Sequence, residues 1–235
     1  MMNKKILLIL ILSLIPMLAW SQGKVTVPKK QPPSKKENKQ SSKFKSKDNT
    51  MTQPINTESF EYEILDHSKK TAALKSAKDV TGAVVIPSSV VIKNISYAVT
   101  SIGSGAFRGC SGLISVEIPN SITSIGRDAF RGCKSLTYIE IPNSVTSIDA
   151  YAFQGCRSLK SIRIPISVTS IKDSTFFHCS ELTSVEIPNS VTLIESNAFY
   201  GCRALTSLII PMKFKSRIDK IFKDCSNLKT VNYTE

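Results

Sequence analysis

The sequence predicts a solenoid of stacked coils, each with one short parallel β-strand and one short helical turn, preceded by a β-hairpin that caps the N-terminal end. Two observations carry this prediction. Nearly the same stretch of sequence occurs at 106–128 and again at 129–151, and all 6 cysteines of the chain recur at this same interval. Such a period is typical of a repeat array, in which each coil is too small to bury its own apolar face and neighbouring coils bury it jointly.

Other residue types keep the register of the cysteines. A phenylalanine stands three positions before each cysteine, a leucine three positions after it, and an aliphatic residue six positions after it. Five of the six coils then continue with Ile-Pro. The cysteine column is Cys110, Cys133, Cys156, Cys179, Cys202 and Cys225. The phenylalanine column is Phe107, Phe130, Phe153, Phe176, Phe199 and Phe222.

Residues 136–142 show how one coil forms its strand. Ile139 and Ile141 have strand spacing and are expected to face the interior, so Tyr138 and Glu140 face outward. Pro142 then ends the strand, because it has no N–H to donate to a neighbouring strand.

The helical turn is expected in "AYAFQGC", residues 150–156, where Ala152, Phe153 and Cys156 have helical spacing. Cysteines of one column have parallel Cα–Cβ bonds about 4.8 Å apart, and this arrangement does not give a disulfide its geometry without strain. We therefore interpret the cysteines as buried apolar thiols, with disulfides between adjacent coils as the alternative. A zinc site is disfavoured, because His67 and His178 are the only histidines and do not repeat with the cysteines.

Residues 1–21 are predicted to be a secretory signal peptide. Two lysines precede an apolar run that ends at Trp20, and small residues at 19 and 21 stand before a cut at Gln22. The run is shorter than the roughly 20 residues of a membrane-spanning helix, although an uncleaved anchor is the alternative. There is no cysteine near the cut for a lipoprotein anchor and no second stretch of transmembrane length. We expect an exported protein that is secreted, periplasmic or at the cell surface.

Residues 22–57 are predicted to be a disordered basic linker, because Lys, Ser, Gln and Pro dominate them and few apolar residues are available for burial. Residues 1–57 hold 11 lysines and 2 acidic residues, and so account for 9 of the 13 formal positive charges. The rest of the chain has no dense basic stripe, so nucleic acid is not an expected partner. The linker is either a solvated spacer or, over residues 24–57, an electrostatic contact with an anionic envelope.

The pattern A-F-x-x-C-x-x-L-x-x-V-x-I-P-x-S-V-T-x-I resembles the BspA-like, or type-5, leucine-rich repeat. The resemblance covers residues 96–235, which hold six coils. It implies a leucine-rich-repeat solenoid in an exported protein of the adhesion type, because known members are associated with adhesion to host matrix proteins and to other bacteria. The periodicity by itself indicates only the scaffold.

Both ends of the array depart from the pattern. Residues 58–95 are interpreted as a β-hairpin cap and a degenerate first coil, because the interval from Ile86-Pro87 to Ile118-Pro119 is longer than the interval between later Ile-Pro pairs. The last coil replaces the Ser-Val-Thr-x-Ile segment with a basic cluster at residues 213–223. We interpret this cluster as protection of an exposed strand edge, with a polyanion site as the alternative.

The outward, concave face of the strands is the candidate binding surface, because solenoids use such faces for protein ligands. Tyr138, flanked by Glu140 and Arg163, is the strongest single candidate, since aromatic residues and arginine dominate interface energetics. Small residues are also tolerated between crowded strands, which is a structural alternative for the serines. Alternation places two columns on this face: Ser115, Tyr138, Ser161, Ser184 and Ser207, and beside them Glu117, Glu140, Arg163, Glu186 and Ile209.

Catalytic motifs are missing from the sequence. It has no Gly-rich phosphate loop, no His-Glu-x-x-His and no metal-ligand spacing. A cysteine nucleophile needs an accessible thiolate, and although His178 precedes Cys179, the repeat predicts that this sulfur is buried. We therefore expect a non-enzymatic module without cofactor or metal that recognises a host matrix or bacterial surface protein. The alternative is an envelope-associated spacer whose lysine-rich linker binds anionic glycan or lipid.

Overall fold

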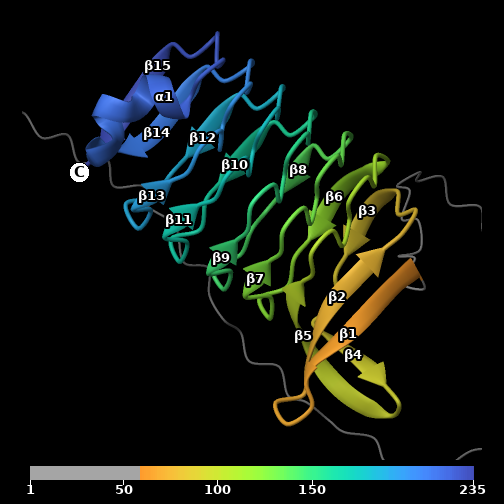
Figure 1. Ribbon diagram of the computed structural model, residues 1–235. Helices are drawn as coiled ribbons and strands as arrows, with labels where there is room; N and C mark the ends of the chain where they lie inside the picture. The colour runs from red at the N-terminus through yellow and green to blue at the C-terminus, as the bar shows by residue number, and fades with distance from the viewer. Residues whose placement is uncertain (1–58) are drawn as a thin grey trace, which may run out of the picture. The chain divides into compact units, whose positions relative to one another are not determined.

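The structure is a computed structural model that describes residues 59–235 (Figure 1). These residues form a parallel β-solenoid of about 7 turns with a repeat of about 23 residues and little helix. Strands of successive coils lie side by side in two rows. The predicted solenoid and its period are thereby confirmed, whereas the predicted signal peptide and basic linker lie outside the described residues.

The first row consists of the strands that lead into Ile-Pro and of β15, which has no Ile-Pro after it. They pair in parallel within two sheets, β3-β6-β8 and β10-β12-β14-β15. The register is one repeat, so that Ser161 aligns with Ser184 and Ser184 with Ser207. The row contains β3 (Gly82–Val85), β6 (Leu113–Glu117), β8 (Tyr138–Ile139), β10 (Ser161–Arg163), β12 (Ser184–Glu186), β14 (Ser207–Pro211) and β15 (Thr230–Thr234).

The second row was not expected as strands. Its strands lie within the Ser-Val-Thr-x-Ile segment of each coil, where Ser124 pairs with Ser147 and Ile125 with Ile148. Most of these strands have two residues, which is too short for the alternation that marks a strand in a sequence. The row contains β5 (Ile95–Ile102), β7 (Ser124–Ile125), β9 (Ser147–Ile148), β11 (Ser170–Ile171) and β13 (Leu193–Ile194).

The predicted N-terminal hairpin is confirmed. Strands β1 (Phe60–Asp66) and β2 (Thr71–Ala77) are antiparallel, and β2 pairs in parallel with β5. A second hairpin joins β4 (Ser89–Ile92) to β5. Lys93 and Asn94 between them have φ of 50° and 63°, as a two-residue type I′ turn requires. This second hairpin accommodates the additional residues by which the first coil exceeds the repeat.

The predicted helical turn of each coil is a series of hydrogen-bonded turns. In one coil the amide of Arg131 donates to the carbonyl of Asp128 at 3.0 Å, and that of Cys133 to Phe130 at 3.1 Å. These i to i−3 bonds have the spacing of a 3₁₀-helix, which is usual in pieces this short. The last coil has longer helical segments, η2 (Met212–Arg217) and α1 (Ile218–Ile221).

The phenylalanine column forms a continuous stack in the interior. Rings of neighbouring coils are nearly parallel, with centroids 5.0 to 5.4 Å apart. At the N-terminal end, Phe60 of β1 meets Phe107 edge-on at 6.1 Å and so covers the first ring of the stack. Offset stacking and edge-to-face contact are both favourable arrangements of aromatic rings. The stack therefore joins the cap to every coil.

The cysteine column lies beside this stack, and all six cysteines are free and buried. Each thiol from Cys133 onward donates to the carbonyl of the phenylalanine one coil back, at 3.1 to 3.3 Å. Cys110 donates to Ala77 of the cap in the same way. Burial raises the pKa of the Cys133 and Cys179 thiols to about 12. These two thiols are thus neutral, and the column links its coils by weak hydrogen bonds.

Removing one ring from the middle of the stack is expected to destabilise the whole array. Phe153→Ala should lower the free energy of unfolding by about 3 to 5 kcal/mol, because the ring is fully buried and its loss leaves a cavity. Urea denaturation followed by circular dichroism measures this change. Phe177→Ala is the matched control, since Phe177 is only partly buried. Equal losses in the two variants would contradict a central role for the stack.

The buried thiols predict a loss of stability in alkali. Thiols of the unfolded chain ionise near pH 9.0, whereas Cys133 and Cys179 in the folded chain keep their protons to about pH 12. The unfolded state therefore binds fewer protons in this window, and the free energy of unfolding falls as pH rises from about 9 to 12. A Cys133→Ala, Cys179→Ala variant should show a shallower fall. An unchanged slope in urea titrations across this range would refute the account.

Candidate protein-binding face

The outward side of the first row of strands, termed the strand face, carries both predicted columns. In β12, for example, Ser184 and Glu186 point outward while Val185 is buried. Register aligns Ser115 with Tyr138 across β6 and β8, and the serines of β10, β12 and β14 with one another. The alternation predicted from the sequence therefore brings these side chains onto one surface.

Tyr138 is the most exposed aromatic side chain of the strand face, at 55%. Its hydroxyl donates to Glu140 Oε2 at 3.3 Å. The negative charge of Glu140 raises the pKa of the Tyr138 phenol, so the phenol stays protonated at neutral pH. The Tyr138 ring is therefore exposed to solvent, and the hydrogen bond to Glu140 fixes the position of its hydroxyl group.

Arg163 lies on β10, the strand that follows the strand of Tyr138 in the row. Its guanidinium lies 3.6 Å from Glu186, the residue aligned with it on β12. β10 still lies next to β8, since the amide of Lys160 donates to the carbonyl of Thr137 at 3.2 Å, although within residues 59–235 no ladder joins the two strands. Both side chains of the ion pair are exposed, at 77% and 46%, so water screens their attraction.

A hollow of about 280 Å³ lies over β10, β12 and β14. The small serines at its floor leave space between the longer side chains of the next column. One of these, Ile209, is 38% exposed and gives the hollow an apolar contact. The outward residues that line it are Ser161, Arg163, Ser184, Glu186, Ser207 and Ile209. The face therefore offers a small recess with a cation, an anion and an apolar group.

The strand face extends beyond the residues predicted from the sequence. On β15, Thr230 aligns with Ser207 and Asn232 with Ile209. Thr230 stands one full repeat after Ser207, so the period could have found it, but the irregular turn of the last coil obscured the match. At the other end Ala83 of β3 aligns with Ser115 across the longer first coil, where the period gives no signal.

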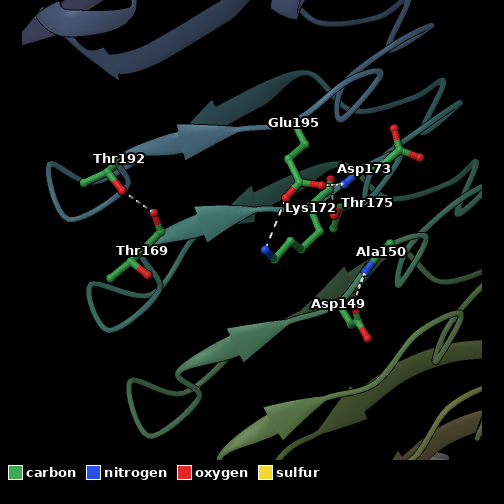
Figure 2. Close-up of polar contacts among 8 residues, drawn as sticks. All are labelled: Asp149, Ala150, Thr169, Lys172, Asp173, Thr175, Thr192 and Glu195. Carbon is green, nitrogen blue, oxygen red and sulfur yellow. Dashed lines mark hydrogen bonds and ion pairs between the residues drawn. The ribbon is translucent and has the colours of Figure 1, made fainter.

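The outward side of the second row, termed the side face, is different because its polar groups bind one another (Figure 2). The hydroxyl of Thr192 donates to the carbonyl of Thr169 at 3.2 Å. Glu195 accepts from Lys172 Nζ at 3.2 Å and from the amide of Asp173 at 3.1 Å. These groups hold adjacent coils together, so they have less hydrogen-bonding capacity to offer a partner than the strand face.

The candidate nucleophile of the sequence is unsuited to catalysis in this structure. Cys179 is fully buried, and its pKa of about 12 leaves almost no thiolate at neutral pH. The ring of His178 packs instead over Gly201 and lies edge-on against Phe177 and Tyr200, which stack on each other. Among residues 59–235 there is no cluster of three metal-ligating side chains. No helix in the same range is long and apolar enough to cross a membrane.

Comparison with known proteins identifies the family of these repeats. The model of the BspA type leucine-rich repeat region matches residues 88–179 and 146–235, with six copies. The chain belongs to this family. A search of the curated proteins finds no significant match. Proteins with BspA-type repeats are bacterial surface proteins that generally bind other proteins.

Two solved structures with TM-scores above 0.5 have a similar fold, and a third match has a lower score. The leucine-rich repeat protein of T. pallidum is 30% identical over 76% of this chain and 81% of that chain, with a TM-score of 0.65. The pneumococcal vaccine antigen PcpA is 21% identical, with a TM-score of 0.53, and the match covers 76% of this chain but 45% of that one. A leucine-rich cell surface protein of Faecalibacterium prausnitzii is 27% identical over 69% of this chain and 55% of that chain, with a TM-score of 0.45.

The exposed ion pair of the strand face is expected to add little to stability. Arg163→Ala and Glu186→Ala should each change the free energy of unfolding by less than about 1 kcal/mol, because exposed pairs gain little over their separate hydration. Thermal and urea unfolding of both variants and of the double variant measures this. A coupling clearly above that value would assign the pair a structural role and leave it less available to a ligand.

Proposed function

We propose that the protein is a non-enzymatic binding module that recognises another protein through its strand face. The observation that carries this proposal is the hollow on β10, β12 and β14, where Arg163, Glu186 and Ile209 surround a floor of serines. Membership of the BspA-type repeat family, whose members are generally protein-binding, supports it. The predicted signal peptide supports export to the cell surface or beyond.

The form of the face favours a protein over a small molecule. Its polar, charged and aromatic groups are spread over successive strands, from Tyr138 on β8 to Asn232 on β15, rather than converging in one deep pocket. Extended solenoid surfaces of this kind suit macromolecular ligands. A host matrix protein or a bacterial surface protein is the proposed partner.

The charges of the strand face indicate which kind of protein it would bind. The outward column holds three glutamates, Glu117, Glu140 and Glu186, and one arginine, Arg163. Glu186 is paired with Arg163, whereas Glu117 lies on the exposed end of β6. Complementary potentials steer partners together, so the partner is expected to present basic residues opposite β6 and β8.

Binding should depend on the strand face. A pull-down with residues 22–235 against matrix and envelope fractions identifies a ligand, and a titration then compares variants. Tyr138→Ala combined with Arg163→Ala should weaken binding at least about tenfold, because exposed aromatic and arginine side chains dominate binding energy. Arg157→Ala is the matched control, since Arg157 is exposed outside the strand face. Unchanged affinity of the double variant would refute the proposed surface.

The basic linker allows the alternative function to be separated from this one. Deleting residues 24–57 should leave strand-face binding intact, because none of the strand-face residues lies in that range. An envelope-associated spacer would instead lose its surface retention on this deletion, and retention of the full chain would weaken with salt. Loss of retention with no strand-face ligand would favour the spacer.

A further inference from the structure

The two ends of the solenoid carry open strand edges. Within residues 59–235, β14 is the only strand that pairs with β15, and β2 is the only strand that pairs with β1. The outer backbone groups of both strands are therefore free to accept another strand. Edges of this kind promote association unless something covers or opposes it.

The geometry of β15 shows which groups are free. The amide of Thr230 donates to the carbonyl of Thr206 at 3.0 Å, so Thr230 directs its backbone toward the preceding coil. Backbone groups alternate in direction along a parallel strand. Val231 and Tyr233 therefore direct their N–H and C=O groups to the open side.

The interior is also incompletely covered at this end. Leu205 and Leu208 of the preceding coil are fully buried. The residues one repeat later, Leu228 and Val231, are only partly buried, and so is Tyr233. The end of the core thus presents apolar side chains together with an open strand edge.

The surroundings of β15 are basic. Residues 212–235 hold six Lys or Arg and three Asp or Glu. Lys215 Nζ lies 5.6 Å from the centre of the Tyr233 ring. Lys213 Nζ donates to the carbonyl of Asn189 at 2.9 Å, and the side chain of Asn189 accepts from the Thr234 hydroxyl. Lys229 directly precedes the strand, so lysines stand near both of its ends.

Strand β1 has the opposite character. Its sequence, FEYEILD, contains three acidic residues and no basic one. Phe60 and Tyr62 pack toward the core, while Glu61 and Glu63 are exposed on the other side. Lys78 lies 3.6 Å from Glu61, and Lys69 lies 4.0 Å from Asp66. Among the described residues Glu63 has no ion-pair partner within 4.0 Å.

We propose that β1 of one molecule adds to the open edge of β15 of a second molecule, so that copies associate head to tail. β1 lies at the end of the second row and β15 at the end of the first, so the pairing would set the second row of one molecule beside the first row of the other, with the apolar face of Phe60 and Tyr62 next to Val231 and Tyr233. It would also bring the glutamates of β1 near the lysines beside β15. This interface is independent of the strand-face function proposed above.

The charges also favour this head-to-tail pairing over a symmetric pairing of two identical edges. Two β15 edges would oppose lysine to lysine, and two β1 edges would oppose glutamate to glutamate. Like charges across an interface disfavour the wrong partner, so a heterologous contact results. Because these groups are exposed, the association is expected to be weak and sensitive to salt.

Sedimentation velocity of residues 22–235 over a range of concentrations tests the proposal. The mean sedimentation coefficient should rise with concentration at about 50 mM salt, and the rise should largely vanish at about 500 mM salt. Two charge-reversed variants locate the contact: Glu61→Lys with Glu63→Lys for the head, and Lys213→Glu with Lys215→Glu for the tail. Each variant alone should associate at least about tenfold more weakly than the natural chain.

An equimolar mixture of the two variants should associate again. In the mixture each unaltered edge meets an unaltered edge, and each reversed edge meets a reversed edge. A symmetric contact between two tails would instead survive in the head variant alone. Lys134→Glu, an exposed site far from β15 in the sequence, controls for net charge and should associate like the natural chain. Circular dichroism confirms that each variant is folded.

A second test alters the backbone of β15 and leaves its charges unchanged. Val231→Pro removes an outward N–H that an edge strand can lose without breaking its inner pairing, and it should abolish association, whereas Val231→Ala should keep it. The proposal is overturned if the natural chain stays monomeric at low salt, if the head variant alone still associates, or if the mixture stays monomeric. In the first case the lysines act only to protect the edge.

Discussion

Stacking of identical side chains across coils is the constraint on which this structure depends. No coil has an interior of its own, so each phenylalanine ring of the column packs on the ring before it, and the thiol of Cys156 donates to the carbonyl of Phe130. The repeat length sets this contact, because a coil one residue longer or shorter would move its side chains out of the column. The cysteines fit here as small apolar residues with a weak donor, and their burial in one column leaves them free.

A fixed register also decides what the outer surfaces can do. Once Ile139 and Val185 face the interior, their neighbours must face outward, and the strand face follows. The side face has the same register but a different chemistry, since Glu195 and Lys172 satisfy each other there. Departures from the repeat, such as Tyr138 in a column of serines and Ile209 in a column of charges, therefore produce the features of the strand face that a partner could recognise.

The coils at the two ends of a repeat array each lack one neighbour, so each end has to be covered in its own way. At the N-terminal end Phe60 closes the phenylalanine stack and a hairpin supplies the missing neighbour of β5. At the other end η2 and α1 replace a strand of the second row, while β15 leaves its outer edge open. The acidic strand β1 and the basic residues around β15 lie where the repeat no longer constrains the sequence. Their charges can therefore serve the proposed association between molecules.

The sequence by itself determined the period, the interior columns and the alternation of the strands, because burial repeated in every coil leaves the same residue types in the same places. It also predicted free thiols, since one column cannot give a disulfide its geometry. Only the tertiary structure decided that Arg163 forms an ion pair with Glu186, that two-residue strands form a second row, and that β4 and β5 absorb the additional residues of the first coil. Each of these depends on which neighbouring strand lies within reach, and a period does not specify that.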